Sequence, residues 1–232
     1  MKRFWKDVAV APAAGGWQVA LDGRPLRTQG GAQQVAPSAA LAAMLSAEWC
    51  AQPEEIDPHG FPLRDLTDFA LDKVQAELGG MVERLLRFAE TDTLCYRADP
   101  DEPLYRRQLE LWEPLLTACE TQHGVKFERV SGVGHRTQPA ATIAALRQRL
   151  ESADVFAIAA LTTLASLASS LVVALAALEP GADADALFAA SNAEEDWQAQ
   201  QWGWVDDAEH VRALRLAAFR MAVSFIAAAR NV

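Results

Sequence analysis

Residues 155–178 contain no charged side chain, and this stretch limits what the chain can fold into more than any other part of the sequence. A helix of that length could cross a bilayer. However, more than half of the stretch is Ala, Ser or Thr, which gain little from transfer into lipid, and the acidic residues Asp154 and Glu179 flank it directly. We therefore expect the buried central helix of a helical bundle and no stable membrane insertion, with a membrane-associated subunit as the alternative.

The first part of the chain has the pattern of an antiparallel meander. Residues 4–10 are rich in aromatic and β-branched side chains, and residues 17–21 alternate between apolar and polar, as half-buried strands do. The Asp22-Gly23 pair then predicts a two-residue hairpin turn into residues 24–28, and a short strand is expected at residues 33–35.

Helical periodicity follows. Ser38 is the expected N-cap of a first helix that ends before Pro53, and Gly124 is the expected C-cap of a long helix over residues 103–123. In that long helix we expect a core of four leucines, namely Leu104, Leu111, Leu115 and Leu116. The other expected helices cover residues 68–78, 81–90, 139–150, 154–178, 183–201 and 206–229, with a break at Gly79-Gly80 and short strands at 91–97 and 125–130. The sequence thus predicts an α+β fold with a small antiparallel β-rich N-terminal domain (residues 1–60) and a larger α-helical C-terminal domain (residues 61–232).

Charge and cysteine content narrow the class of protein. The formal net charge of -10 predicts repulsion from nucleic-acid phosphates and from anionic lipid, so we expect neither as a partner. The three cysteines are an odd number at wide spacings, which favours a reducing compartment. No secretory or transit segment is recognised at the N-terminus, so we expect a bacterial cytoplasmic protein.

The sequence carries no recognisable catalytic motif. It has neither a phosphate-binding P-loop nor a nucleophile elbow nor a pair of histidines at metal-binding spacing. Asp206, Asp207 and His210 could ligate a metal on one helix face, but acidic residues are also typical of a helix start. We expect no enzyme, no cofactor and no metal; the alternative is a small-molecule hydrolase or metal-dependent enzyme that uses this cluster or a Cys95–His123 pair.

The densest group of polar and aromatic side chains lies at residues 194–204. On a helix, Glu194, Gln198 and Gln201 share one face, whereas Glu195 and Trp202 lie two turns apart on another. Two interpretations remain open from composition: a solvated helix start whose tryptophans anchor the core, or a recognition surface of aromatic anchors with polar groups around them.

Taken in order, several segments resemble the family of assembly chaperones for the alpha subunit of the F-type ATP synthase. The segments that carry the resemblance are residues 3–8, 16–28, 37–52, 56–63, 91–97, 108–114 and 194–203. The sequence departs from the family pattern at Gln29, Phe61, Arg64, Ala118 and His123, which are mostly packing or turn positions.

The resemblance implies a chaperone that binds the unassembled alpha subunit, prevents its aggregation and releases it to beta subunits. It implies client-binding roles for Glu194, Glu195 and Gln198, with Glu194 at the family's important acidic position. It further implies a structural signature formed by Trp49, Trp202 and Gly203, in which the tryptophans hold the chaperone's own fold. We expect the protein to be a monomer.

Overall fold

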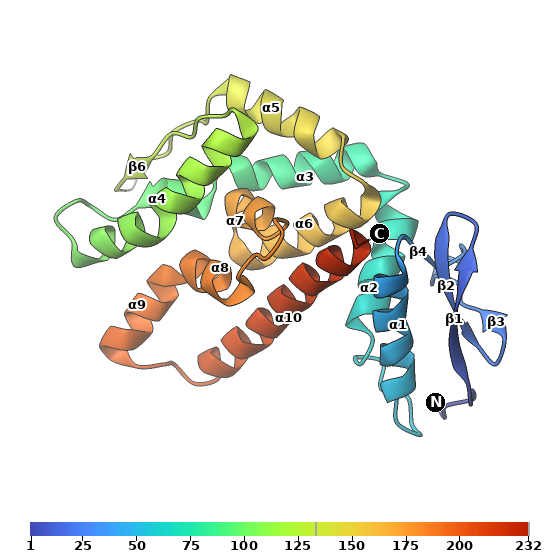
Figure 1. Cartoon of the computed structure of the whole chain (residues 1–232). Coiled ribbons are helices and arrows are strands. Elements are labelled where there is room, and N and C mark those ends of the chain that lie inside the picture. The colour runs from blue at the N-terminus through green and yellow to red at the C-terminus, as the bar shows by residue number, and fades with distance from the viewer. Residues whose placement is uncertain (133, 232) are drawn as a thin grey trace. The chain divides into compact units, whose positions relative to one another are not determined.

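The computed structural model describes residues 1–132 and 134–231, which form two compact units. Unit 1 contains Met1–Leu78, Asp154–Ala160 and the chain from Ser224 onward, and unit 2 contains Gly79–Ala153 and Leu161–Val223. The fold is α+β, as predicted, with a small antiparallel sheet at the N-terminus and helices through most of the remaining chain (Figure 1). The division at residue 60 into two domains stays a prediction.

The N-terminal sheet is built on one hairpin. Strands β1 (Val8–Ala13) and β2 (Gly16–Leu21) pair antiparallel, and the short strands β3 (Arg24–Pro25) and β4 (Val35–Ala36) both pair with β2. The predicted turn is confirmed: Asp22 and Gly23 have φ values of 49° and 77°, the positive angles that a type I′ turn requires.

The first strand begins later than predicted, at Val8 instead of residue 4. The reason is Trp5, whose buried ring packs edge-on against Trp49 with ring centroids 4.9 Å apart. Because the indole of Trp5 is turned into the core, residues 4–7 do not follow the regular pleat of a strand.

Unit 1 also contains consecutive helices, and a carboxylate of the first helix caps the second. Helix α1 (Ala39–Ala51) begins at the predicted N-cap, where Ser38 Oγ accepts the N–H of Leu41 at 3.0 Å. Helix α2 (Pro62–Asp68) continues as the π-helix η1 (Phe69–Val74), so the helix predicted over 68–78 begins six residues earlier. The two oxygens of Glu48 accept the N–H groups of Leu63 and Arg64 at 2.6 and 2.9 Å, which caps α2 from a distant part of the sequence.

Unit 2 begins with helix α3 (Leu78–Glu90), and the predicted break at Gly79-Gly80 is wrong. The turn lies at residues 75–77, and the two glycines occupy the first turn of α3, where an imperfect helix former matters less than in the interior. The strand predicted at 91–97 is a 3-10 turn η2 (Thr93–Cys95) followed by β5 (Tyr96–Arg97). The strand predicted at 125–130 is reduced to β6 (Val130–Ser131), which pairs parallel with β5.

Helix α4 (Pro103–His123) has the predicted bounds, and Gly124 caps it with a left-handed φ of 64°. Of the four leucines expected in its core, only Leu116 is fully buried. The buried stripe of α4 consists of Gln108, Trp112, Leu116, Cys119 and Glu120. Trp112 determines this orientation, because its Nε1 donates to the carbonyl of Ala190 at 2.7 Å.

The uncharged stretch forms two helices, α6 (Val155–Ala168) and α7 (Leu171–Ala176), instead of the single predicted helix. The chain turns at Ser169, which has a φ of 49°, and Ser170 Oγ caps α7 by accepting the N–H of Val173 at 3.0 Å. Much of the stretch is completely buried, as predicted. Across residues 1–132 and 134–231, no helix combines the length and apolar character needed to cross a membrane.

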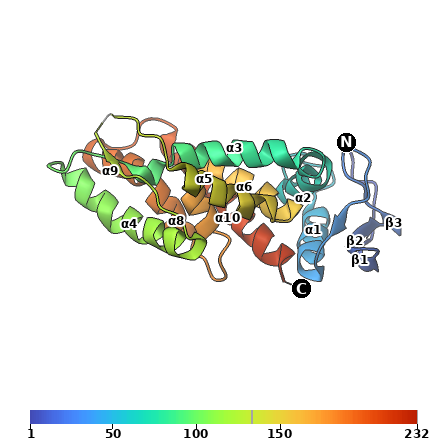
Figure 2. The same cartoon turned by 90° about the horizontal axis from the view of Figure 1, so that it is seen from above.

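Four further helices complete the chain: α5 (Ala140–Glu151), α8 (Ala184–Ser191), α9 (Ala193–Trp202) and α10 (Ala208–Ala229). The helix predicted over 183–201 is interrupted at Asn192, whose φ and ψ of -109° and 21° are not helical. Within unit 2, α4 packs against α7 and α9, and α8 packs against the same two helices (Figure 1 and Figure 2). This arrangement places the start of α9 beside the middle of α4.

Candidate functional site

Helix α9 carries the polar and aromatic group that the sequence singled out. Its first turn contains three consecutive acidic residues, Glu194, Glu195 and Asp196, which complement the positive end of the helix dipole. The three carboxylates have different surroundings, and these differences decide which of them is available to a partner.

Two of the acids are paired with arginines of α10. Asp196 Oδ2 lies 2.5 Å from a guanidinium nitrogen of Arg212, and Glu195 Oε2 lies 3.5 Å from Arg215. Both guanidinium groups also lie over the ring of Phe188, at 5.3 and 5.7 Å from its centroid. These contacts hold the start of α10 against α8 and α9, so Glu195 and Asp196 stabilise the fold.

Glu194 is different because it has no cationic partner in the described part of the chain. Its Oε1 accepts a hydrogen bond from Gln108 Nε2 at 2.7 Å. Gln108 is completely buried in α4, and its own Oε1 accepts the N–H of Ala98 at 2.8 Å. Partial burial raises the pKa of Glu194, and the hydrogen bond from Gln108 opposes this rise. The result is an oriented carboxylate without a counter-ion among residues 1–132 and 134–231.

Two further polar residues of α9 fall on the same side as Glu194, whereas Gln200 lies on another side. Gln198 and Gln201 follow it by one and two helical turns, and all three residues are exposed. We call Glu194, Gln198 and Gln201 the α9 face. Of the three residues predicted to bind a client, the structure places Glu194 and Gln198 on this face, whereas Glu195 turns toward α10.

The three residues of the expected structural signature have different environments. Trp49 is half-buried between Trp5 and Phe61, with ring centroids at 4.9 and 4.6 Å. Gly203 ends α9 with φ and ψ of 81° and 168°, a conformation essentially restricted to glycine. Trp202 differs from the expectation of a core anchor, since 79% of its surface is exposed.

Gln108 belongs to the segment 108–114 that carries the family resemblance, but it was not predicted to be a site residue. A further signal was its polar side chain in line with Trp112 and Leu116 on the buried stripe of the long helix. A buried amide must be hydrogen-bonded, and here its two partners are the backbone of Ala98 and the carboxylate of Glu194.

The side chains considered for catalysis do not form a reactive site. No group of three or more His, Cys, Asp and Glu side chains is arranged to hold a metal ion within the described residues, and Asp206, Asp207 and His210 are exposed. Cys95 is buried, and burial raises the pKa of its thiol, which is the opposite of what a nucleophilic thiolate needs.

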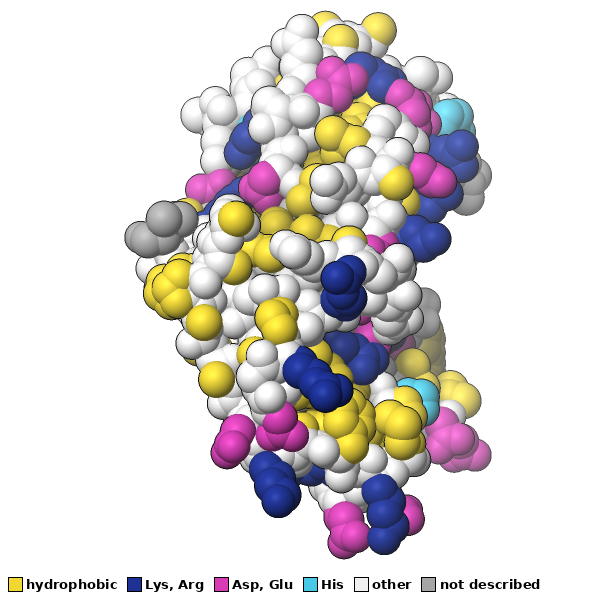
Figure 3. Space-filling model, turned by 90° about the vertical axis from the view of Figure 1, so that its right-hand side faces the viewer, with side chains coloured by type: hydrophobic (Ala, Val, Ile, Leu, Met, Phe, Trp, Pro, Cys, Tyr) yellow, Lys and Arg dark blue, Asp and Glu magenta, His cyan; other side chains and the backbone are white. Residues whose placement is uncertain are grey.

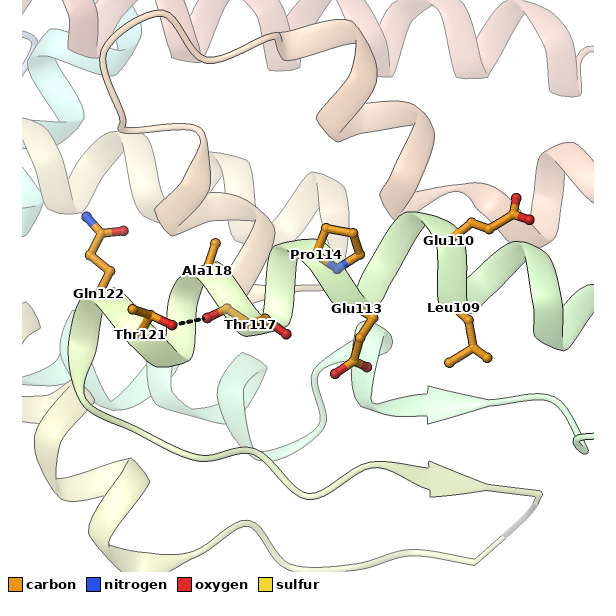
Figure 4. A pocket seen from close by; sticks show the side chains of 8 residues that line it. All are labelled: Leu109, Glu110, Glu113, Pro114, Thr117, Ala118, Thr121 and Gln122. Carbon is orange, nitrogen blue, oxygen red and sulfur yellow. Dashed lines mark hydrogen bonds between the residues drawn. The ribbon is translucent and has the colours of Figure 1, made fainter.

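Two other concave surfaces are lined by apolar side chains or by carboxylates that are already hydrogen-bonded within the protein. An open groove of about 700 Å³ follows the solvent side of α4, where Leu109, Pro114 and Ala118 supply apolar surface (Figure 4). A second hollow contains the carboxylates of Asp68 and Asp72, but these already accept hydrogen bonds from the loop between β3 and β4. The bonds from Gln34 to Asp68 and from Gly30 to Asp72 are 2.6 and 2.8 Å long.

Comparison with known proteins shows which class of protein this chain belongs to. Residues 2–120 match the family described as ATP12 chaperone protein, and the chain belongs to this family. The family consists of assembly chaperones for the F1 ATP synthase, not of enzymes, which confirms the resemblance predicted from the sequence.

Individual relatives extend the match over nearly the whole chain. The chain is 28% identical over 225 residues to the mitochondrial protein atp12 of Schizosaccharomyces pombe, covering 90% of this chain and 76% of that protein. It is 37% identical to the crystal structure of Atp12 from Paracoccus denitrificans, with a TM-score of 0.93 and coverage of 99% and 98%. The Atu1473 protein of Agrobacterium tumefaciens is 40% identical, with a TM-score of 0.92 and coverage of 98% and 85%.

Proposed function

We propose that this chaperone binds the unassembled alpha subunit of the F1 ATP synthase and shields the surface that later packs against beta subunits. An isolated subunit of a large ring exposes apolar interface, which favours aggregation. A protein that covers such a surface needs no nucleotide, because a binding affinity below that of the final assembly is sufficient for release. We further propose that it acts as a monomer in the bacterial cytoplasm.

The observation that carries the proposal is the unpaired carboxylate of Glu194. The hydrogen bond from buried Gln108 fixes its direction, and no cation of the described chain neutralises it. A lysine or arginine of the client would supply the missing charge, and the amide of Gln198, one turn further along α9, could accept or donate beside it. Glu195 is the weaker candidate, because Arg215 already occupies it.

The test is size-exclusion chromatography and calorimetric titration with isolated alpha subunit, and with beta subunit as the specificity control. We expect a complex with alpha alone. Glu194→Lys should weaken this complex by about 30-fold or more, because reversal of an interface charge places like charges together. Glu194→Gln keeps an acceptor for Gln108 but removes the charge, so it should lose most of the same affinity.

The matched control is Glu77→Lys, which makes the same charge change at an exposed position in unit 1. It should bind the alpha subunit like the unmodified protein. Glu194→Gln and Glu77→Lys should keep the melting temperature within a few degrees, because neither glutamate forms an ion pair among the described residues and glutamine still accepts from Gln108. Glu194→Lys removes the acceptor of the buried Gln108 amide and should cost about 1–3 kcal/mol of stability, so Glu194→Gln is the decisive variant. Failure of the unmodified protein to bind folded alpha subunit would refute the proposal.

A further inference from the structure

Large apolar side chains are exposed at the end of α9 and the start of α10, in unit 2. We call this group the Trp202 patch; its members and their exposed fractions are Trp202 79%, Val205 78%, Val211 50% and Leu214 58%. The connection between the two helices is short, and Arg212 of α10 contacts both Asp196 in the first turn of α9 and the ring of Trp204 in the connection. Clustered exposed apolar residues are typical of interaction surfaces, whereas isolated ones are not.

The periodicity of α10 supports this interpretation. Phe219 and Ala222 are buried, and the same stripe continues toward the N-terminus of the helix through Arg215, which pairs with Glu195, and through Val211, at spacings of four. At Val211 the stripe extends beyond the residues that cover it, and half of this side chain is exposed. The first turns of α10 therefore expose two apolar side chains, Val211 and Leu214, which lie three residues apart on one side of the helix.

The charges around the patch indicate what kind of surface it fits. Asp206, Asp207 and Glu209 are exposed beside it and have no ion-pair partner among the described residues. The neighbouring arginines are already paired, Arg212 with Asp196 and Arg215 with Glu195. By contrast, basic and acidic side chains are interspersed on the face that Figure 3 shows. A second copy of the chain or an anionic lipid surface would meet like charge here, whereas a basic protein surface would not.

We infer that the Trp202 patch is the apolar half of the client interface, in which Trp202 inserts into an apolar pocket bordered by Lys or Arg on the assembly client. Trp202 follows Glu194 by eight residues on α9, which places it roughly 12 Å along the helix axis and about a quarter-turn around it. On α9, the carboxylate of Glu194 and the indole of Trp202 thus lie near opposite ends of the helix on neighbouring sides, so that one partner can contact both. This inference rests on the proposed function, since it concerns the same client.

The two halves have separable physical roles. Long-range attraction between charges accelerates encounter and weakens with salt. Burial of an indole in a pocket mainly slows dissociation and depends little on salt. Glu194 should therefore affect the association rate and the salt dependence, and Trp202 the dissociation rate.

The experiment compares Trp202→Ala, Glu194→Gln and the unmodified protein in surface-based kinetics with alpha subunit at two or more salt concentrations. We expect Trp202→Ala to raise the dissociation rate by roughly 10- to 30-fold while the salt slope stays unchanged. A second variant, Val205→Ser/Leu214→Ser, should act in the same direction. Phe4→Ala is the matched control, because it removes an aromatic ring that is 68% exposed but lies in unit 1.

Each outcome distinguishes this inference from the proposed function. If the unmodified protein binds the alpha subunit and Trp202→Ala dissociates at the same rate, the inference is wrong and the proposed function stands. If the unmodified protein binds neither subunit, both are wrong. A self-associated chaperone that Trp202→Ala converts to monomer, or sedimentation with phosphatidylglycerol vesicles that Trp202→Ala abolishes, would assign the patch to another occupant and overturn the inference.

Discussion

At the scale of single residues, the orientation of Glu194 depends on Gln108. Gln108 is buried and connects the backbone of Ala98 to the carboxylate through two hydrogen bonds of 2.8 and 2.7 Å. It does not reach the surface, so under the proposed function it would act on the client by orienting Glu194. We therefore propose that Gln108 is a positioning residue.

We predict that Gln108→Leu weakens binding of the alpha subunit by about 3- to 10-fold, because the carboxylate loses its fixed direction. It should also destabilise the fold by roughly 1–3 kcal/mol, since the N–H of Ala98 is left without its acceptor. Titration calorimetry and urea unfolding measure the two effects.

A double-mutant cycle separates positioning from general damage. In a Glu194→Lys background, Gln108→Leu should change the affinity little further, because the group it positions has already been replaced. An undiminished effect of Gln108→Leu in that background would show that Gln108 contributes through stability alone.

The choice between Glu194 and Glu195 could not be made from the sequence. Both are acidic residues in the same first turn, and the feature that separates them is the arginine pairing supplied by α10. Likewise, the exposure of Trp202 depends on where α9 ends relative to its neighbours, which no local pattern reports. The order and spacing of the segments indicated the family. Which side chains are free to contact a partner depends on the packing of the helices, and the sequence does not show this packing.

At the scale of elements, the junction between α6 and α7 depends on a buried carboxylate. Asp92 is completely buried, and its two oxygens accept the N–H groups of Leu94 and Val172 at 3.1 and 3.0 Å. It thereby joins η2 to the first turn of α7, about eighty residues further along the chain. Burial raises the pKa of Asp92 to about 6, although the surrounding hydrogen bonds oppose the rise.

This pKa predicts a specific pH dependence of stability. Since the folded-state pKa lies above the ordinary value of 3.8, the folded protein holds this proton more tightly than the unfolded chain does. The stabilising contribution is therefore complete below pH 3.8 and is lost as the pH rises through about 6. Relative to Asp92→Asn, which does not titrate, the unfolding free energy should fall by roughly 2 kcal/mol between pH 4 and pH 7.

Urea unfolding of the unmodified protein and of Asp92→Asn at several pH values measures the difference between their unfolding free energies. The titration of other groups contributes equally to both proteins and cancels in this difference. Asp183→Asn is the control, because Asp183 is an exposed N-cap of α8 and asparagine caps equally well. A constant difference between Asp92→Asn and the unmodified protein across this range would contradict the raised pKa.

The bounds of a helix could be predicted where capping residues next to its ends define them. Helix α4 has a proline at its first position and a capping glycine directly after its last, so both ends could be predicted. The start of α2 depends on Glu48, which comes from α1, and the start of α7 is capped both locally by Ser170 and by Asp92 from about eighty residues earlier. The buried stripe of α4 was misjudged because Trp112 and Gln108, and not most of the leucines, face the core.

At the scale of the whole molecule, the charge and the proposed surface together describe a chaperone that binds reversibly. The net charge of -10 is moderate for a chain of 232 residues, and acidic groups lie beside the apolar Trp202 patch. Such a surface attracts a basic client quickly, yet its few anchors limit how tightly the client is held. A chaperone of this kind should release its client by competition.

We predict that isolated beta subunit displaces the chaperone from a preformed complex with alpha subunit, without ATP. The reason is mass action: if the shielded surface of alpha is the one that beta buries, the two partners exclude each other and the larger interface prevails. Size-exclusion chromatography should show free chaperone increasing with beta concentration, and more of it at higher salt, because salt weakens the contact of Glu194 more than an apolar subunit interface. Assembled F1 is the control, since its beta subunits are already engaged and should release nothing. A stable complex of chaperone, alpha and beta would mean that the chaperone covers some other surface of its client.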